Sequence, residues 1–217
     1  MISFKYRSAI LIGAQLVYIL TSGLWQDPVN TLVLPVLLYV GLFAAGGFLI
    51  ANSKRWLLLY ILVTLSGIAL GLNNEIIALR AGSIVLLSLS HVLLFRQLFI
   101  HIMKPTTLLG DRLLSGVAGY LLLSIFWALQ MQWSLLETNE AIQNHVTGEF
   151  IVAGPELLYY SIVTLTTLGF GDISPMTWLA KAISAFTSFS GVLYLAIFIS
   201  AIVGSADFGV KSGGVDR

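Results

Sequence analysis

The segment from Thr164 to Asp172 reads TLTTLGFGD, and it lies between two apolar runs that are long enough to cross a bilayer. These runs extend from Leu113 to Leu136 and from Trp178 to Ala206. A polar turn that contains glycine is costly in hydrocarbon, because its backbone groups lack hydrogen-bond partners there. It is tolerated where it lines a cavity that holds water or ions. The pattern therefore predicts a re-entrant loop at membrane depth.

The glycines of this segment indicate what the loop can do. Gly169 and Gly171 alternate with Leu168 and Phe170, and glycine adopts positive φ at little steric cost. Alternating the backbone twist turns successive carbonyl oxygens toward one side. Several chains around one axis would then stack rings of oxygens that replace the water shell of a cation, and the Thr167 hydroxyl would add one more ring. A tight turn between two helices is the simpler alternative.

Residues 166–172, TTLGFGD, resemble the potassium-channel signature, in which backbone carbonyls form the selectivity filter. Leucine takes the place of the commoner valine, and phenylalanine that of the commoner tyrosine. The resemblance is specific over the pore module, about 113–206. It implies K⁺ sites at the carbonyls of Thr167, Leu168, Gly169 and Phe170 and at the Thr167 hydroxyl, with Gly171 completing the filter and Asp172 at its outer mouth.

The composition is that of a membrane protein. Charged residues make up 10% of the chain and hydrophobic residues 58%, and the mean hydropathy is +0.94. The absence of cysteine from the sequence excludes disulfides, thiol catalysis and Cys-bound metals. A net charge of +1 without a basic tract gives no indication of nucleic-acid binding. We therefore expect an all-α membrane protein that is not an enzyme and needs no cofactor, with K⁺ as a permeant ion.

Six transmembrane helices are expected, because each uncharged run approaches the roughly 20 residues needed to cross about 30 Å of hydrocarbon. The basic head and first run also fit a cleavable signal peptide, but we interpret them as a retained helix. The expected domains are an N-terminal four-helix unit (1–104), a pore domain (105–207) and a short cytoplasmic tail (208–217). The predicted spans are 9–24, 31–51, 56–72, 76–101, 113–136 and 178–206.

A short helix is predicted directly before the filter. Gly154-Pro155-Glu156 reads as a helix start, with proline in the first turn followed by an acid. From there to Thr166 is about three turns, too short to span but suited to a pore helix, whose negative C-terminal end would point at a central cation. The resemblance implies that Tyr159 and Tyr160, with Thr166, support the filter from behind.

Val163 stands where some prokaryotic relatives place a glutamate that pairs with the filter aspartate. That pair is therefore absent, and Asp172 must find another partner or face water. Phe170 also lacks the hydroxyl that a filter tyrosine would use for bracing. His145, in the acidic segment from Glu137 to Gly154, titrates near neutral pH in its free form. Whether it senses external pH is left open.

Six helices with a pore loop between the last two resemble the voltage-gated-like architecture, so the fourth helix has to be considered as a sensor. A sensor needs several arginines at every third position, because one charge crossing 100 mV contributes only about 2.3 kcal/mol. Here Arg80 and Arg96 are far apart, with His91 and neutral residues between them. A degenerate sensor without steep voltage gating is predicted.

The last span carries the candidate gate. Gly191 stands where many potassium channels have a glycine hinge in the inner helix; close packing against a neighbour is the alternative. Leu195, Ile199 and Val203 follow at i, i+4 spacing and share one face. That face is expected to line an inner cavity and to constrict it by dewetting.

One filter segment cannot enclose an ion, so a homotetramer surrounded by membrane lipid is expected. Basic residues gather at alternate loops, which predicts a multi-pass protein of the plasma or inner membrane with both termini cytoplasmic. The function predicted is a potassium-selective channel that conducts K⁺ passively. A weakly selective monovalent cation channel is the nearer alternative, and a secondary transporter or membrane scaffold the farther one. A separate regulatory subunit is left open.

Overall fold

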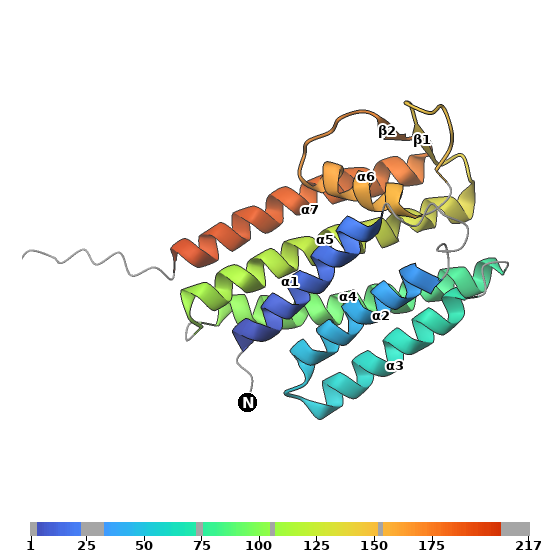
Figure 1. The fold of residues 1–217 in the computed structure, drawn as a ribbon. Helices are drawn as coiled ribbons and strands as arrows, with labels where there is room; N and C mark the ends of the chain where they lie inside the picture. Colours follow the sequence, from blue (N-terminus) through green and yellow to red (C-terminus); the bar gives the residue numbers. More distant parts are fainter. Residues whose placement is uncertain (1–3, 23–32, 73–75, 105–106, 152–153, 205–217) are drawn as a thin grey trace, which may run out of the picture.

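The computed structural model describes residues 4–22, 33–72, 76–104, 107–151 and 154–204. Side chains 4–5 and 33–38 are not described, and the expected tail at 208–217 lies outside the described residues. Helices dominate, with one small sheet near the end of the chain (Figure 1). In chain order the elements are α1 Phe4–Thr21, α2 Val33–Ile50, α3 Lys54–Gly71, α4 Ile77–Met103, α5 Leu109–Glu137, β1 Ile142–Asn144, α6 Pro155–Leu165, β2 Ile173–Pro175 and α7 Trp178–Val203.

Four of the described helices, α3, α4, α5 and α7, are long and apolar enough to cross a bilayer. The longest, α5, has 29 residues, which at about 1.5 Å per residue exceeds the roughly 30 Å of hydrocarbon. Helices α1 and α2 have 18 residues each, and their fully described apolar stretches, Tyr6–Thr21 and Tyr39–Ile50, are shorter than a usual span. The chain is thus a multi-pass membrane protein with these four candidate spans.

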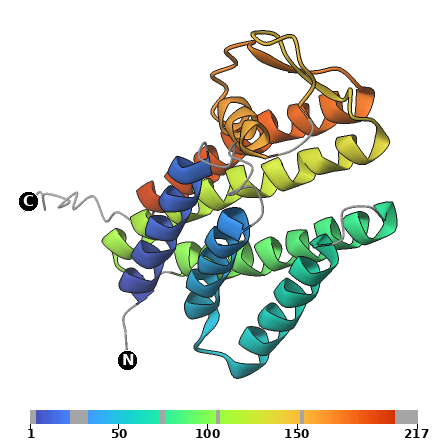
Figure 2. The same ribbon diagram turned by 45° about the vertical axis from the view of Figure 1, so that its right-hand side comes forward.

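Helix α5 is the centre of the fold. It packs against α1 and α4 on one side and against α6 and α7 on the other. Figures 1 and 2 show the same order from two directions: α3 and α4 lie on the far side of α5 from α7 and α6. One apolar cluster joins α1 to α5 and includes Leu11, Leu42, Tyr60, Leu94 and Leu122. The N-terminal helices and the predicted pore helices therefore share a core.

The predicted start of the fifth helix was wrong by one turn. The sequence placed Arg112 in a linker and began the span at Leu113, whereas α5 begins at Leu109 and takes Arg112 into its first turns. The Arg112 side chain is only 4% exposed. Its Nη2 donates to the Lys104 carbonyl at 2.7 Å and its Nη1 to the Ala201 carbonyl at 3.4 Å. A buried cation with two carbonyl acceptors is compatible with a helix, which is why the charge did not end it.

The segment after α5 contains a small sheet that the sequence did not predict. Strand β1 pairs antiparallel with β2, in the register Ile142 with Pro175 and Asn144 with Ile173. The Ile151 amide also donates to the Ile142 carbonyl. The isoleucines at 142, 151 and 173 are buried in a second apolar cluster under the sheet. The residues that directly follow the TLTTLGFGD segment are thereby fixed to the residues before α6.

Candidate functional site

Helix α6 ends directly before the predicted filter segment, Thr167–Gly171. Its N-cap is Gly154, with a φ of 88°, and Pro155 and Glu156 lie in the first turn, as the sequence predicted. Its 11 residues extend about 16 Å, roughly half of the hydrocarbon thickness. Thr166 is its C-cap, and the Thr166 hydroxyl donates to the Ile162 carbonyl at 2.8 Å. The helix is therefore too short to cross a bilayer.

Hydroxyl groups anchor α6 to both long helices beside it. The Tyr160 hydroxyl lies 2.7 Å from the Ser184 hydroxyl of α7, and the Ser161 hydroxyl donates to the Ser124 carbonyl of α5 at 2.7 Å. Buried hydroxyls need such partners, so each contact fixes the position of the helix. The resemblance implied a supporting role for Tyr160 but named no partner for its hydroxyl. The serine partners were missed because their contacts depend on packing between helices.

The filter segment alternates in backbone handedness. Thr167, Gly169 and Gly171 have positive φ values of 59°, 57° and 78°, whereas Leu168 and Phe170 do not have positive φ. The two glycines adopt the conformation expected from sequence. Thr167 was not expected there, since a residue with a side chain loses about 1–2 kcal/mol in this conformation. The alternation of φ thus begins at Thr167, one residue before the Leu168-Gly169 pair at which the sequence placed its start.

In this segment the amides of residues 167–169 are hydrogen-bonded, whereas the carbonyls of residues 167–170 are not bonded to any described residue. The Leu168 and Gly169 amides donate to the Val163 carbonyl at 3.0 and 3.3 Å, and the Thr167 amide donates to the Thr164 carbonyl at 3.0 Å. Within the described part of the chain, no donor contacts the carbonyl oxygens of residues 167–170. The Leu168 and Phe170 residues are 57% and 64% exposed. The end of α6 therefore satisfies the amides of residues 167–169, while the carbonyl oxygens of residues 167–170 accept no hydrogen bond from the described chain.

Asp172 directly follows the filter segment. Its carboxylate binds a residue other than the glutamate that some prokaryotic relatives carry at position 163. The Tyr159 hydroxyl donates to Asp172 Oδ2 at 2.7 Å, and the Ile173 amide donates to Oδ1 at 3.0 Å. The bond to Asp172 raises the pKa of the Tyr159 hydroxyl, which consequently stays protonated and continues to donate. Tyr159 thus contacts the residue that directly follows the filter segment, through its carboxylate.

The small sheet holds the same residue from the other side. The His145 amide, just after β1, donates to the Asp172 carbonyl at 2.7 Å, and the His145 ring contacts the Ser174 hydroxyl. On α6, Glu156 accepts a hydrogen bond from the Asn144 side chain at 2.9 Å. The outer end of the filter segment is therefore held by α6 and by β1 together.

Gly191 lies where α7 crosses the end of α6. A Cβ at this position would be 2.1 Å from the Leu165 carbonyl oxygen, which also accepts a hydrogen bond from the Tyr120 hydroxyl. Helix α7 continues without interruption past Gly191 to Val203. The structure thus supplies a packing reason for glycine here, and the hinge role stays a prediction.

The other predicted cavity residues are on a different face of α7. Its buried residues are Ala180, Thr187, Gly191 and Tyr194, which face α5 and α6. In contrast, Leu195, Ile199 and Val203 are exposed in the single chain. Their common face does not contact the core, so it is available to line a space or to contact another molecule.

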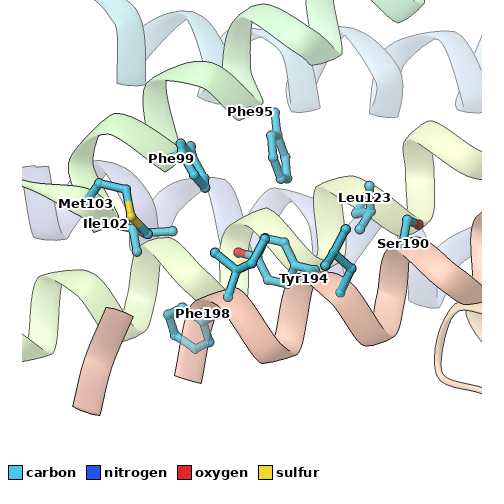
Figure 3. Close-up of a pocket in the computed structure, with 10 residues that line it drawn as sticks. Phe95, Phe99, Ile102, Met103, Leu123, Ser190, Tyr194 and Phe198 are labelled. Carbon is cyan, nitrogen blue, oxygen red and sulfur yellow. The ribbon is translucent and has the colours of Figure 1, made fainter. Parts of the chain in front are cut away.

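The described residues also enclose an apolar cavity of about 230 Å³ between α4, α5 and α7 (Figure 3). Phe95, Phe99 and Met103 of α4 face Tyr194 and Phe198 of α7 across it. It lies away from the filter segment and offers little to a charged ligand. Among the described residues, no group of three His, Asp or Glu side chains is placed to hold a metal ion.

Comparison with known proteins agrees with this geometry. The family described as Ion channel matches residues 113–205, a range that holds most of α5 and all of α6, the filter segment and α7. Residues 113–205 are an ion-channel domain. The chain is similar to the potassium voltage-gated channel protein Shal of Drosophila melanogaster, with 34% identity over 85 residues, and to the human A-type voltage-gated potassium channel KCND3, with 45% identity over 49 residues.

These similarities cover 39% and 23% of this chain but only 14% and 8% of the two relatives. No solved structure matches the chain significantly. The comparisons therefore identify the channel domain as a pore domain similar to those of voltage-gated potassium channels.

Replacing Gly191 by Ala should destabilise the channel domain. The added methyl group would press on the Leu165 carbonyl, and such overpacking typically costs about 1–3 kcal/mol. Thermal unfolding of the purified protein would measure the loss. Gly110→Ala is the matched control, because a Cβ at Gly110 meets no atom within 4 Å. Unchanged thermal stability combined with altered channel opening would instead favour a hinge.

Replacing Tyr159 by Phe should shorten the time for which the channel domain stays conducting. The ring would remain, but Asp172 Oδ2 would lose its donor, and the outer end of the filter segment would be held less firmly. Sustained current recordings would show a faster decline. Tyr160→Phe removes a hydroxyl that contacts Ser184 instead, so it should change this decline less. A wild-type time course in Tyr159→Phe would refute the role of the bond.

Proposed function

We propose that this protein is a potassium-selective channel that conducts K⁺ passively through the carbonyl oxygens of residues 167–170. The observation that supports it best is the division of the filter backbone. Amides of residues 167–169 are satisfied by the end of α6, while the neighbouring carbonyls accept nothing from the described chain. Free carbonyl oxygens in a row can replace the water around a cation. The potassium channels named by the comparisons point to the same ion.

The proposed assembly is a homotetramer, because one chain supplies one row of oxygens and a closed ring needs rotational symmetry. Helix α7 supports this view, since many of its large apolar side chains are exposed in the single chain. Phe186 and Phe189 are each 64% exposed, and Val192 is 57% exposed. In the assembly, neighbouring subunits and membrane lipid would cover them. Leu195, Ile199 and Val203 would line the inner cavity.

The proposed membrane arrangement has six spans, with α1 and α2 completing the four candidates described above. Both termini would be cytoplasmic in the cell membrane, because Arg55, Arg96 and Lys104 then lie on the inner side together with the basic ends. Residues 1–104 would form the N-terminal unit and 105–207 the pore domain. Short apolar spans can cross by local thinning of the bilayer, which makes helices of 18 residues sufficient.

The proposed channel is not steeply voltage-gated. Among the described residues Arg96 forms no ion pair with an acid and lies over the Trp56 ring, 4.8 Å from its centre. The sequences of α1, α2 and α3 contain no Asp or Glu, so they offer no counter-charges along which arginines could move. With Arg80 as the other arginine of α4, little charge can cross the field.

Purified protein in liposomes should carry a K⁺ flux that barium blocks and that Gly169→Ala abolishes. Alanine at a φ of 57° is strained by about 1–2 kcal/mol in each chain, and relaxation would turn the filter carbonyls away from the axis. Gly148→Ala is the matched control: Gly148 also has positive φ, 77°, but lies in the exposed turn after β1, so its replacement should leave the flux intact.

The reversal potential in mixed Na⁺ and K⁺ separates the alternatives in the same preparation. A value near the K⁺ equilibrium potential is expected, and a value near zero would indicate a weakly selective cation channel. Flux that requires a second, coupled ion gradient would indicate a transporter. A flux unaffected by Gly169→Ala would remove the filter segment from the conduction path.

Patch-clamp recordings across the physiological voltage range should show open probability that changes only gradually with voltage. The physical reason is the small charge on α4, since two separated arginines cannot supply the tens of kcal/mol that steep gating draws from the field. Neutralising Arg80 and Arg96 together should leave the voltage dependence nearly unchanged. A steep sigmoid activation curve that flattens in this double variant would contradict the proposal.

A further inference from the structure

The first transmembrane helix is joined to α5 by polar contacts inside the apolar core. The Ser8 and Ser115 hydroxyls lie 3.4 Å apart, and the Gln15 amide donates to the Ala118 carbonyl at 3.1 Å. All three polar side chains are fully buried. A buried amide without a partner is costly in an apolar environment, so these contacts fix the register of α1 on α5 at two heights. These contacts indicate that α1 packs against an α5 helix. They do not by themselves distinguish the α5 of the same chain from that of a neighbour, which would offer the same groups.

The short connection between α4 and α5 determines whether the N-terminal helices pack on the α5 of their own chain or on that of a neighbour. Helix α4 ends at Met103 and α5 begins at Leu109, which leaves five residues between them. Even a fully extended chain covers at most about 3.6 Å per residue, or roughly 20 Å over the six steps. The observed connection is not extended, because the Thr107 amide donates to the Lys104 carbonyl and the Thr107 hydroxyl to the His101 carbonyl, at 3.1 and 3.0 Å.

A neighbour's α5 would lie beyond the reach of such a turn. In a ring of pore domains, equivalent α5 helices are separated by at least two further helices, each about 10 Å across. The linker would have to unfold completely and lose both Thr107 contacts to cover that separation. Packing of α4 on the α5 of its own chain needs no such change, and the two helices already pack along each other.

Arg112 of α5 binds the ends of both α4 and α7 of the same chain. Its guanidinium donates to the Lys104 carbonyl at the end of α4 and to the Ala201 carbonyl in the last turn of α7. The charge is almost completely buried, so neither acceptor can be withdrawn without leaving a desolvated cation. The last turns of α4 and α7 therefore share one donor within a single subunit.

We infer that the four N-terminal helices of each subunit pack on the pore helices of their own chain and that neighbouring subunits meet only through the channel domains. This inference rests on the proposed homotetramer. Its consequence is that whatever α1–α4 respond to acts on the α7 of the same chain, through α5 and Arg112. The exposed face of α7 around Phe186, Phe189 and Val192 is then left for the neighbours and the lumen.

Disulfide trapping of Ser8 and Ser115 tests this directly, because the chain contains no cysteine. The full-length Ser8→Cys, Ser115→Cys double variant is oxidised in membranes and run on a denaturing gel without reductant. Loss of reactive thiols, measured by a mass-tagged maleimide, shows that the disulfide has formed. We expect that the maleimide labels neither cysteine, because both are in the disulfide, and that the protein runs at the mass of a single chain.

A ladder of dimers, trimers and tetramers that disappears with reductant would show exchange between subunits and overturn the inference. Persistently free thiols would overturn it too, because the two hydroxyls are 3.4 Å apart. Each single-cysteine variant should keep its thiol free and run as one chain; dimers of the Ser8→Cys variant would place α1 beside the α1 of a neighbour.

The mass of the intact assembly, measured by light scattering before denaturation, separates this inference from the proposed function. A fourfold mass with an intrachain disulfide supports both. Any other mass contradicts the homotetramer, whereas the gel still reports whether α1 is bound to its own α5. A variant that has lost its fourfold mass while the wild type keeps it is replaced by the pair Ser8→Cys, Ala118→Cys, one turn along the same face, read in the same way.

Discussion

The backbone of the filter segment depends on the Val163 carbonyl at the end of α6. It accepts the amides of Leu168 and Gly169, so the chain must reverse sharply after Thr166 and continue with alternating handedness. Amides and carbonyls of one peptide unit point in opposite directions, so amides held toward α6 leave carbonyls directed away from it. The Val163 backbone performs this task, so it places no demand on the side chain of residue 163.

Everything else near the site keeps the end of α6 in place. Tyr120 of α5 donates to the Leu165 carbonyl, Tyr160 contacts α7 through Ser184, and Gly191 allows α7 to approach Leu165 closely. These contacts come from two helices, α5 and α7, that are separate from α6 in sequence. Because a short helix of three turns has little stability of its own, its position must be imposed by its neighbours. The long helices of the channel domain thus act as a rigid frame for a few peptide groups.

The sequence predicted most of the elements and the outline of the site. Hydropathy located the helices to within a few residues, and Pro155 marked the start of α6, because both signals are local. The glycines at 169 and 171 predicted their own positive φ. Thr167 could not be predicted in this way, since its strained conformation is imposed by the hydrogen bonds of the reversal after α6. The sheet was missed because three-residue strands have no periodicity to detect.

Arg112 shows where local reasoning about charge fails in a membrane protein. A cation next to an apolar run is normally assigned to the interface, and here it is buried between the ends of two helices. The last carbonyls of α4 and α7 lack partners within their own helices and carry partial negative charge, so one guanidinium satisfies both ends at once. Movement of the end of α7 away from α5 must therefore either break this contact or carry the end of α4 with it. Together with the direct ring contact between Phe95 of α4 and Tyr194 of α7, whose centres are 5.7 Å apart, this bond connects the N-terminal helices to α7.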